Sequence, residues 1–366
     1  MRSVFSSAKA ALSRRWGPVV ALVTLAVLPA CANKTADAQP VPHTPQIAGL
    51  ASRADAGEEA YVCNFGYDST PGATVSPIDL VDGKADPRIT TGTLPDAVAA
   101  TPNGRLVLVA DEGQDLLSVL DASDGDIVAT IPTGVEPDAI AVSPDSDVAL
   151  VANVDDNTVT PVNLKTFRAE KPLHVGPQPD AVAIGGPDGS TALVADLGNG
   201  TVTPVDLRTM TTRSAIAVGD EPDAIALSPS GTIAAVADLG SNAVTFVDLA
   251  TLRAGRTVNV GVAPTDVVTD DASPASSASP SSRPVAWVAG GTDLVPVSYA
   301  SERLAGSPVA VDRLVEALAI ARDGTTAWVA DQSPDVTEVN LLSGRPAESV
   351  AVGGRPSSIV IPPPLH

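Results

Sequence analysis

The chain has 366 residues, among them 43 acidic and 22 basic ones, and a formal net charge of −21. The hydrophobic fraction of 44% is enough for a buried core and argues against general disorder. Such an acidic chain would repel phosphate backbones, which argues against nucleic-acid binding. Three His and two Cys also leave little for zinc, iron–sulfur or haem sites.

The first thirty residues have the features of an export signal. Four basic residues precede an apolar run from Val19 to Ala30. The run is shorter than the roughly 20 residues that span a bilayer, but it suits a signal-peptide core. It ends in Leu28-Pro29-Ala30-Cys31, which resembles the lipobox of bacterial lipoproteins, where the Cys is lipidated and becomes the new N-terminus. Ordinary cleavage after Ala32 is the alternative, because Pro29 replaces the small residue usual at its position.

The segment that follows predicts a tether rather than a domain. Residues 31–60 are rich in Ala, Pro, Gln, Asp and Thr without apolar periodicity, which is typical of disorder. We therefore expect a signal peptide over 1–30, a tether that begins at a lipidated Cys31, and one domain over 61–366. The protein would be exported and held at the outer face of the cytoplasmic membrane by its lipid, or secreted if Cys31 is not lipidated.

One repeat fills the rest of the chain. Its first phrase, Pro-Asp-Ala-Ile/Val-Ala, is followed by phrases such as Leu150-Val-Ala-Asn153 and Thr158-Val-Thr-Pro-Val-Asn-Leu164. Each phrase is a short run of Val, Ala, Ile and Thr bounded by Gly, Pro, Asp or Asn, which predicts a strand. The copies begin at Pro95, Pro137, Pro179, Pro222, Pro264, Val315 and Pro356, with spacings of 42, 42, 43, 42, 51 and 41 residues. Four strands in such a repeat, apolar on both faces, predict the blade of a β-propeller.

The two ends of the repeat array complete each other. The phrases Tyr61–Asn64 and Thr74–Leu80 are a second and a third strand without a first, and Pro356–Ile361 is a first strand without the others. We predict an all-β, seven-bladed β-propeller in which three N-terminal strands and one C-terminal strand share a blade. This closure removes the sheet edges that an open array would expose. An insertion over 272–283 accounts for the long spacing.

The phrases resemble those of the YVTN-repeat β-propellers. Pro137–Asp145, Leu150–Asn153 and Asn157–Asn163 match successive parts of that repeat, and the likeness covers residues 61–361. The resemblance implies the architecture and an exported or surface protein, without a shared reaction. The third strand departs from the pattern by containing a proline in four copies, at Pro77, Pro161, Pro204 and Pro296. Because proline cannot donate to a sheet, we expect a bulge or an unpaired amide there.

A ring of carboxylates is the first candidate site. An acid follows the first residue of the inner strand in five copies, as Asp96, Asp138, Asp180, Asp223 and Glu316. We expect these side chains to point toward the channel axis at one height, where they either bind a cation such as calcium or accept backbone N–H bonds. Apart from that ion, no cofactor is expected. A metal-assisted enzyme of the lyase or lactonase kind, with carboxylates at the channel mouth, is the alternative function.

Charge segregation is the second candidate feature. In an up-and-down blade, the loops from the second to the third strand share a face with the loops between blades. Both sets of loops carry many acids, and the loops from the second to the third strand carry no Lys or Arg. The acids are Asp68, Asp111, Glu112, Asp115, Glu136, Asp155, Asp156, Asp196, Asp220, Glu221, Asp238, Asp293, Asp331 and Asp335. Basic residues such as Lys165, Arg208 and Arg345 fall near the third-to-fourth connections. One face should therefore be strongly negative, either for solubility or for binding a partner.

Three further features have simple explanations. Cys63 stands where the other copies have Ala, which predicts a small buried residue. His174 has no repeated partner, and the run Asp121–Asp126 lacks the Glu of an EF-hand loop, which favours a turn. We therefore predict a monomeric, non-catalytic, lipid-anchored propeller that binds a protein, a cationic ligand or a cell-envelope component on its acidic face.

Overall fold

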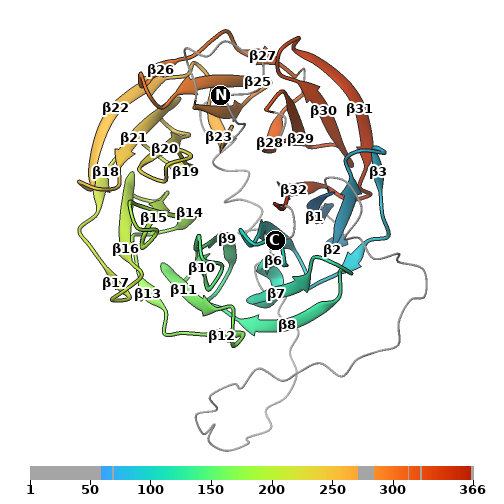
Figure 1. Ribbon diagram of the computed structural model, residues 1–366, viewed down its shortest axis with the longest axis horizontal. Helices are drawn as coiled ribbons and strands as arrows, with labels where there is room; N and C mark the ends of the chain where they lie inside the picture. Colours follow the sequence, from blue (N-terminus) through green and yellow to red (C-terminus); the bar gives the residue numbers. More distant parts are fainter. Residues whose placement is uncertain (1–58, 68–69, 271–283, 312, 322–323, 364–366) are drawn as a thin grey trace, which may run out of the picture. The chain divides into compact units, whose positions relative to one another are not determined.

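The computed structural model describes residues 59–67, 70–270, 284–311, 313–321 and 324–363. The export signal, Cys31, the tether up to residue 58 and the 272–283 insertion lie outside the described residues, whereas residues 59 and 60, also assigned to the tether, begin a strand. The described chain forms seven small antiparallel sheets arranged in a ring, which confirms the predicted seven-bladed β-propeller (Figure 1). A single turn of 3₁₀ helix, η2 (Glu112–Gln114), is the helical element of this part, and no helix in it is long and apolar enough to cross a membrane.

Each blade runs outward from the centre of the ring. The inner strands of blades 1 to 7 are β5 (Pro95–Ala100), β9 (Pro137–Val142), β14 (Pro179–Gly185), β19 (Pro222–Leu227), β23 (Pro264–Thr269), β28 (Val315–Ile320) and β32 (Pro356–Val360). The second strands are β6 (Leu106–Asp111), β10 (Val148–Asn153), β15 (Thr191–Asp196), β20 (Ile233–Asp238), β24 (Val285–Gly290), β29 (Thr326–Asp331) and β1 (Glu59–Tyr67). The third strands are β7 (Leu116–Asp121), β11 (Thr158–Asn163), β16 (Thr201–Asp206), β21 (Ala243–Asp248), β25 (Asp293–Ser298), β30 (Asp335–Asn340) and β2 (Thr70–Asp79).

Blade 7 closes the ring as the sequence predicts. Strand β32, from the C-terminal end, pairs with β1, with Tyr61 opposite Val360 and Val62 opposite Ile359. The two strands are separated by almost the whole chain, so their pairing joins the last blade to the first. Each inner strand also contacts the inner strands on both sides of it. The ring therefore has no unpaired first or last blade.

The core lies between the blades rather than within them. Seven clusters of buried apolar side chains occur among the described residues, and each spans two adjacent blades. Tyr61 of blade 7, for example, is 1% exposed and belongs to the same cluster as Val109 of blade 1. Both faces of every sheet are thus buried, which is why the strands lack a polar face in the sequence. Burying one Val or Leu side chain contributes roughly 1.5–3 kcal/mol.

The prolines of the third strand divide the outer strand. In blades 1, 4 and 6, which lack the proline, the outer strands are continuous: β8 (Ile127–Pro132), β22 (Arg253–Asn259) and β31 (Arg345–Ala351). In blades 2, 3, 5 and 7 the outer strand is split into β12 (Arg168–Ala169) and β13 (Leu173–His174), β17 (Thr211–Thr212) and β18 (Ile216–Ala217), β26 (Arg303–Leu304) and β27 (Val309–Ala310), and β3 (Lys84–Ala85) and β4 (Ile89–Thr90). Pro161 still accepts a hydrogen bond from Glu170 N at 2.7 Å, but it has no N–H to give in return. The predicted irregularity is therefore found, and it lies in the neighbouring strand.

The connections separate into two faces of the ring. The loops from second to third strands lie beside the loops between blades, since Val154 N donates to Glu136 O and Leu239 N to Glu221 O. We call this side the mouth face. The first-to-second and third-to-fourth connections form the opposite side, which we call the turn face.

Candidate functional site

The predicted ring residues all lie at one structural feature of the inner strand. In every blade the register between inner and second strand shifts at the residue after the first one, which is the mark of a β-bulge. The bulged residues are Asp96, Asp138, Asp180, Asp223, Thr265, Glu316 and Ser357. A bulge re-aims a side chain relative to a regular strand. The sequence therefore places these residues at equivalent positions around the ring correctly.

Three of the bulged side chains connect one blade to the next. Thr265 Oγ1 donates to the carbonyl of Val315 at 3.0 Å, and Ser357 Oγ donates to the carbonyl of Asp96 at 2.9 Å. Glu316 accepts a hydrogen bond from Arg355 at 3.0 Å, again across a blade boundary. These contacts satisfy polar groups at the inner rim and hold neighbouring blades in register.

The ring does not come together as a metal site in the described part of the chain. Within that part, no group of three or more His, Cys, Asp or Glu side chains is placed to hold one ion. Asp223 is buried at 7% exposure, and the other four acids are partly buried. Cation binding by the ring stays a prediction, whereas blade-to-blade contacts are visible at three of its seven positions.

A second set of polar residues lies buried at the end of the second strand. Asp111 is 0% exposed, and its carboxylate accepts hydrogen bonds from Gly92 N at 2.9 Å and from Ser118 Oγ at 2.6 Å. Asp196 repeats this arrangement with Gly176 N at 2.9 Å and Thr203 Oγ1 at 2.6 Å. Each carboxylate thus ties the loop from the preceding blade to the third strand of its own blade. We call this arrangement the loop latch.

Blade 2 has the neutral version of the loop latch. Asn153 accepts a hydrogen bond from Gly134 N at 3.0 Å and donates to Thr160 Oγ1 at 2.9 Å. The loop latch also requires a glycine in the loop between blades. In blade 1, for example, a Cβ on Gly92 would lie 2.5 Å from Asp111 Cβ. The backbone must approach the latch residue closely, and a side chain there would prevent it.

Burial changes the acidity of the latch carboxylates. Desolvation raises the pKa of Asp111 and of Asp238 from 3.8 to about 6, although hydrogen bonds from Ser118 and Thr245 oppose the change. Desolvation likewise raises the pKa of Asp196. The sequence pattern predicted that Asp111, Asp196, Asp238 and Asp331 contribute charge to the acidic face. That expectation is wrong for these four, because all are 0–2% exposed.

The remaining carboxylates of the mouth face are concentrated over blades 1 to 4. Seven of them form what we call the acidic sector: Glu112, Asp115, Glu136, Asp155, Asp156, Asp220 and Glu221, all exposed or half-buried. The other two, Asp293 and Asp335, are half-buried in blades 5 and 6. Some of them order the loops: Asp156 Oδ2 accepts a hydrogen bond from Val135 N at 2.8 Å, and Asp115 Oδ1 accepts one from Glu136 N at 3.1 Å. Asp68, which was also predicted to lie on this face, is outside the described residues.

The centre of the acidic sector is short of positive charge. The pKa of Glu136 is raised by burial first, and then by the charge of Asp155, a hydrogen bond with Asp155 and the charge of Asp115. Neighbouring carboxylates disfavour the ionisation of one another, because their charges have the same sign. In the described mouth-face loops of blades 1 to 4 there is no Lys or Arg. A cation placed there would therefore lower the electrostatic energy of the folded protein.

The other half of the mouth face differs in a way that the sequence pattern did not predict. Arg313 lies 3.2 Å from Asp331, and Arg355 lies 3.0 Å from Glu316. Both arginines belong to loops between blades, so they neutralise carboxylates near blades 5 to 7. The position of Arg313 and Arg355 just before the first phrase of a repeat was the available signal. The negative charge of the mouth face is therefore uneven: seven acids without a basic neighbour lie over blades 1 to 4, whereas blades 5 to 7 combine Asp293 and Asp335 with two arginines.

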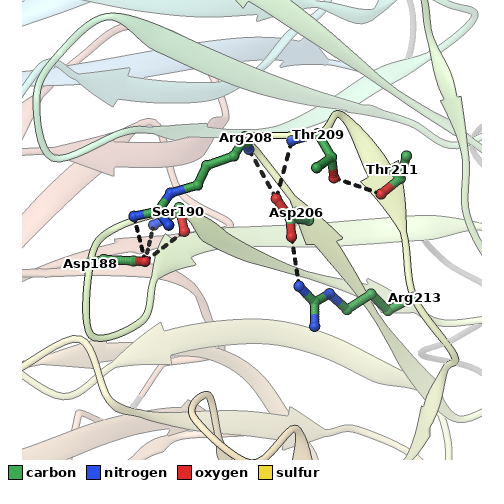
Figure 2. Close-up of polar contacts among 7 residues, drawn as sticks. All are labelled: Asp188, Ser190, Asp206, Arg208, Thr209, Thr211 and Arg213. Atoms are coloured by element: carbon green, nitrogen blue, oxygen red, sulfur yellow. Dashed lines mark hydrogen bonds and ion pairs between the residues drawn. The ribbon is translucent and has the colours of Figure 1, made fainter.

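On the turn face of blades 2 and 3, three basic side chains form ion pairs with carboxylates. Figure 2 shows Arg208 directed at Asp188, at 2.7 Å, and Arg213 directed at Asp206, at 2.6 Å. Lys165 makes the equivalent ion pair with Asp147 in blade 2. Exposed pairs of this kind contribute little to stability, but they cancel charge. The acidic sector is distinct from this face because its loops carry no basic side chain that could cancel its charge.

The three isolated candidates behave as ordinary structural residues. Cys63 is 0% exposed, and burial, followed by the charges of Asp111 and Asp96, raises the pKa of its thiol well above the usual value. His174 is exposed on β13. Asp121 Oδ1 accepts hydrogen bonds from Ser123 N at 2.9 Å and Ser123 Oγ at 2.6 Å, which is turn chemistry.

Comparisons with known proteins support the fold. No protein-family model matches the chain, and no curated protein matches it. Similar solved structures include a functionally unknown protein from Desulfotomaculum acetoxidans DSM 771, with a TM-score of 0.72 and 14% identity over 84% of this chain and 100% of that chain. Hydrazine synthase from Kuenenia stuttgartiensis has a TM-score of 0.59 and 20% identity, over 72% and 88% of the two chains.

A third similar structure is the dihydro-heme d1 dehydrogenase NirN in complex with DHE. It has a TM-score of 0.59 and 12% identity, over 87% of this chain and 77% of that chain. At these identities the likeness shows a shared β-propeller fold and carries no information about activity. The similarity to YVTN-repeat proteins remains a resemblance of sequence phrases.

Proposed function

We propose that the protein is an exported, lipid-anchored and non-catalytic β-propeller that binds a basic segment of a cell-envelope protein at its acidic sector. The observation that supports this best is the group of exposed and half-buried carboxylates without a Lys or Arg in its loops; at its centre the pKa of Glu136 is raised by burial first and then by Asp155 and Asp115. Carboxylates that repel one another in the free protein gain most from a cationic partner. Export and anchoring rest on the signal-like segment and on Cys31.

The fold is compatible with either class of function. Two of the similar structures are named as enzymes, and their likeness extends to architecture alone. No cluster in the described part of the chain favours the metal-assisted lyase or lactonase alternative. A binding role needs the acidic sector alone, which the structure describes in full.

A titration with a fluorescent lysine-rich peptide tests this function. The mature protein is compared with a variant in which Asp115, Asp155 and Asp156 are replaced by Asn, which keeps an oxygen acceptor for the backbone N–H groups. At about 0.5 kcal/mol for each exposed charge lost, we expect the peptide to bind roughly tenfold more weakly and with a smaller salt dependence.

A matched variant distinguishes position from net charge. Asp82, Asp124 and Asp126 are exposed on the turn face, and their replacement by Asn removes the same total charge. Peptide affinity should stay within about twofold of the parent, since charges beyond a Debye length are screened. Equal losses in the two variants would contradict a localised site. The anchor is tested separately: Cys31→Ala should allow a high-salt wash to release the exported protein from membranes, and association that resists the wash as the parent's does would exclude the lipid at Cys31.

A further inference from the structure

A patch of arginines and leucines lies on the outer strands of blades 4 to 6, at the turn face. We call it the basic rim, and it consists of Arg253, Arg256, Arg303, Leu304, Leu342 and Arg345. All six are exposed, with Leu304 at 50% and Leu342 at 63%. Leu342 and Leu304 are among the most exposed large apolar side chains of the described residues, and here they share one patch with four arginines.

The basic rim is one continuous surface. Arg256 N in blade 4 donates to Glu302 Oε2 in blade 5 at 3.2 Å. A Cβ on Gly344 of blade 6 would lie 3.7 Å from Val309 of blade 5. The outer strands of blade 5, β26 and β27, therefore lie between those of blades 4 and 6, as Figure 1 shows at the top of the ring.

The arginines of the basic rim form no ion pair in the described part of the chain, although Asp248 is the residue opposite Arg253 in the sheet. No ion pair among the described residues involves Arg253, Arg256, Arg303 or Arg345. Two carboxylates with described side chains, Asp248 and Glu302, lie close in sequence to these arginines. Asp248 accepts a hydrogen bond from Thr251 N at 2.7 Å, and Glu302 accepts the one from Arg256 N. Lys165 of blade 2 and Arg208 of blade 3 are, in contrast, paired with Asp147 and Asp188.

The described chain also begins and ends at the turn face. Glu59, the first residue of β1, pairs with Asp79 at the end of the third strand, and Val360, the last residue of β32, pairs with Tyr61. Both positions are in blade 7, whose strand β3 contacts β31 of blade 6. Glu59, where the described chain begins, therefore lies on the face that carries the basic rim.

We propose that the basic rim rests on an anionic lipid surface, which turns the acidic sector away from the membrane. Arginines attract anionic headgroups by about 1 kcal/mol each, and exposed leucines enter the interface between headgroups and acyl chains. An acidic protein partner would explain the arginines but not the leucines. The proposal rests on the proposed lipid anchor for its orientation, whereas the binding of the rim itself does not.

The acidic sector does not cancel this attraction. A blade strand of six residues is roughly 20 Å long, so the mouth face lies more than two Debye lengths from the turn face at physiological salt. The turn of blade 1 carries Asp121, Asp124 and Asp126 on the turn face, across the ring from the basic rim (Figure 1). We therefore expect blades 4 to 6 to contact the lipid surface and blade 1 to be held away from it.

Vesicle binding by the non-lipidated protein tests the proposal. The mature chain with Cys31→Ser is mixed with vesicles of phosphatidylcholine, with or without phosphatidylglycerol, and sedimented. We expect binding to the anionic vesicles that falls with salt. Replacing Arg303 and Arg345 with Gln should weaken it about 30-fold, at roughly fivefold per charge. The matched control, Lys165→Gln with Arg208→Gln, should change it by less than about threefold.

The leucines separate a lipid surface from an acidic protein. Leu342→Ser should weaken vesicle binding severalfold and leave the binding of soluble polyglutamate unchanged. Equal binding to neutral and anionic vesicles, an equal loss in the Lys165 and Arg208 control, or no effect of Leu342→Ser would each overturn the proposal. The arginine variant should bind the lysine-rich peptide like the parent, so a failure of the acidic sector as a binding site would be seen separately.

Discussion

The substitution Asp111→Asn should stabilise the protein at alkaline pH and have little effect at acidic pH. In the loop latch, the Asp111 carboxylate accepts hydrogen bonds from Gly92 N and Ser118 Oγ. Asn153 shows that an amide can occupy the same place, with its oxygen toward Gly134 N and its nitrogen toward Thr160. The amide introduced by Asp111→Asn can therefore keep both contacts without a buried charge.

The size of the effect follows from the shifted acidity. Burial raises the pKa of Asp111 from 3.8 to about 6, so the folded protein holds this proton more tightly than the unfolded chain does. Stability from this group therefore increases as pH falls from about 6 toward 3.8, and the charged form is unfavourable above pH 6. At about 1.4 kcal/mol per tenfold change in proton affinity, the ionised side chain costs up to about 3 kcal/mol.

Thermal melts followed by circular dichroism across pH 4 to 8 measure this effect. At roughly 2 °C per kcal/mol for a domain of this size, Asp111→Asn should raise the Tm at pH 8 by up to about 6 °C and leave it unchanged near pH 4. Asp126→Asn, on the exposed turn of the same blade, is the control and should shift the Tm by less than about 1 °C. The converse change, Asn153→Asp, should lower the Tm at pH 8. A variant at position 111 that melts below the parent at pH 8, or by an amount independent of pH, would refute the reasoning.

Three further outcomes are expected. Deleting everything after Arg355 removes the inner strand of blade 7 and should cause aggregation and a loss of several kcal/mol; a truncated protein that melts like the parent would contradict the closure. Gly92→Ala places a Cβ against Asp111 and should destabilise the protein by at least about 2 kcal/mol in urea unfolding. If the ring binds a cation, calcium should raise the Tm of the mature protein in a saturable way, and Asp138→Asn with Asp180→Asn should abolish that gain. No shift in the parent, or an equal shift in the double variant, would leave the ring acids with hydrogen bonding alone.

The architecture could be predicted from the sequence because the fold repeats. Each phrase is short, apolar on both faces and bounded by turn residues, and a mismatch in one copy is corrected by the other copies. The incomplete ends at Tyr61 and Pro356 predicted the closure for the same reason. The five ring acids occupy the same register position in their blades, since they stand one residue after an anchor that every blade shares.

The character of the charged residues could not be predicted in the same way. The sequence pattern around an acid at the end of a strand is the same whether its side chain points to solvent or accepts an N–H from a neighbouring loop. Asp111 was therefore predicted to be surface charge. The Asn at position 153 was the signal, because an amide at an equivalent position indicates hydrogen bonding instead of charge. Pairing across blades, as between Arg355 and Glu316, depends on the curvature of the ring, which the order of residues does not contain.

Photo-crosslinking on the exported protein tests the central claim most directly. A benzophenone is attached at Gln114→Cys, which lies on η2 within the acidic sector, and in a second protein at Thr166→Cys on the turn face; both positions are exposed. The account predicts one dominant protein adduct from position 114 and none of the same mass from position 166. The lysine-rich peptide should compete with this adduct, and the Asp115, Asp155 and Asp156 substitutions should abolish it. The same adduct from both positions, or one that persists without the three carboxylates, would contradict binding at the acidic sector.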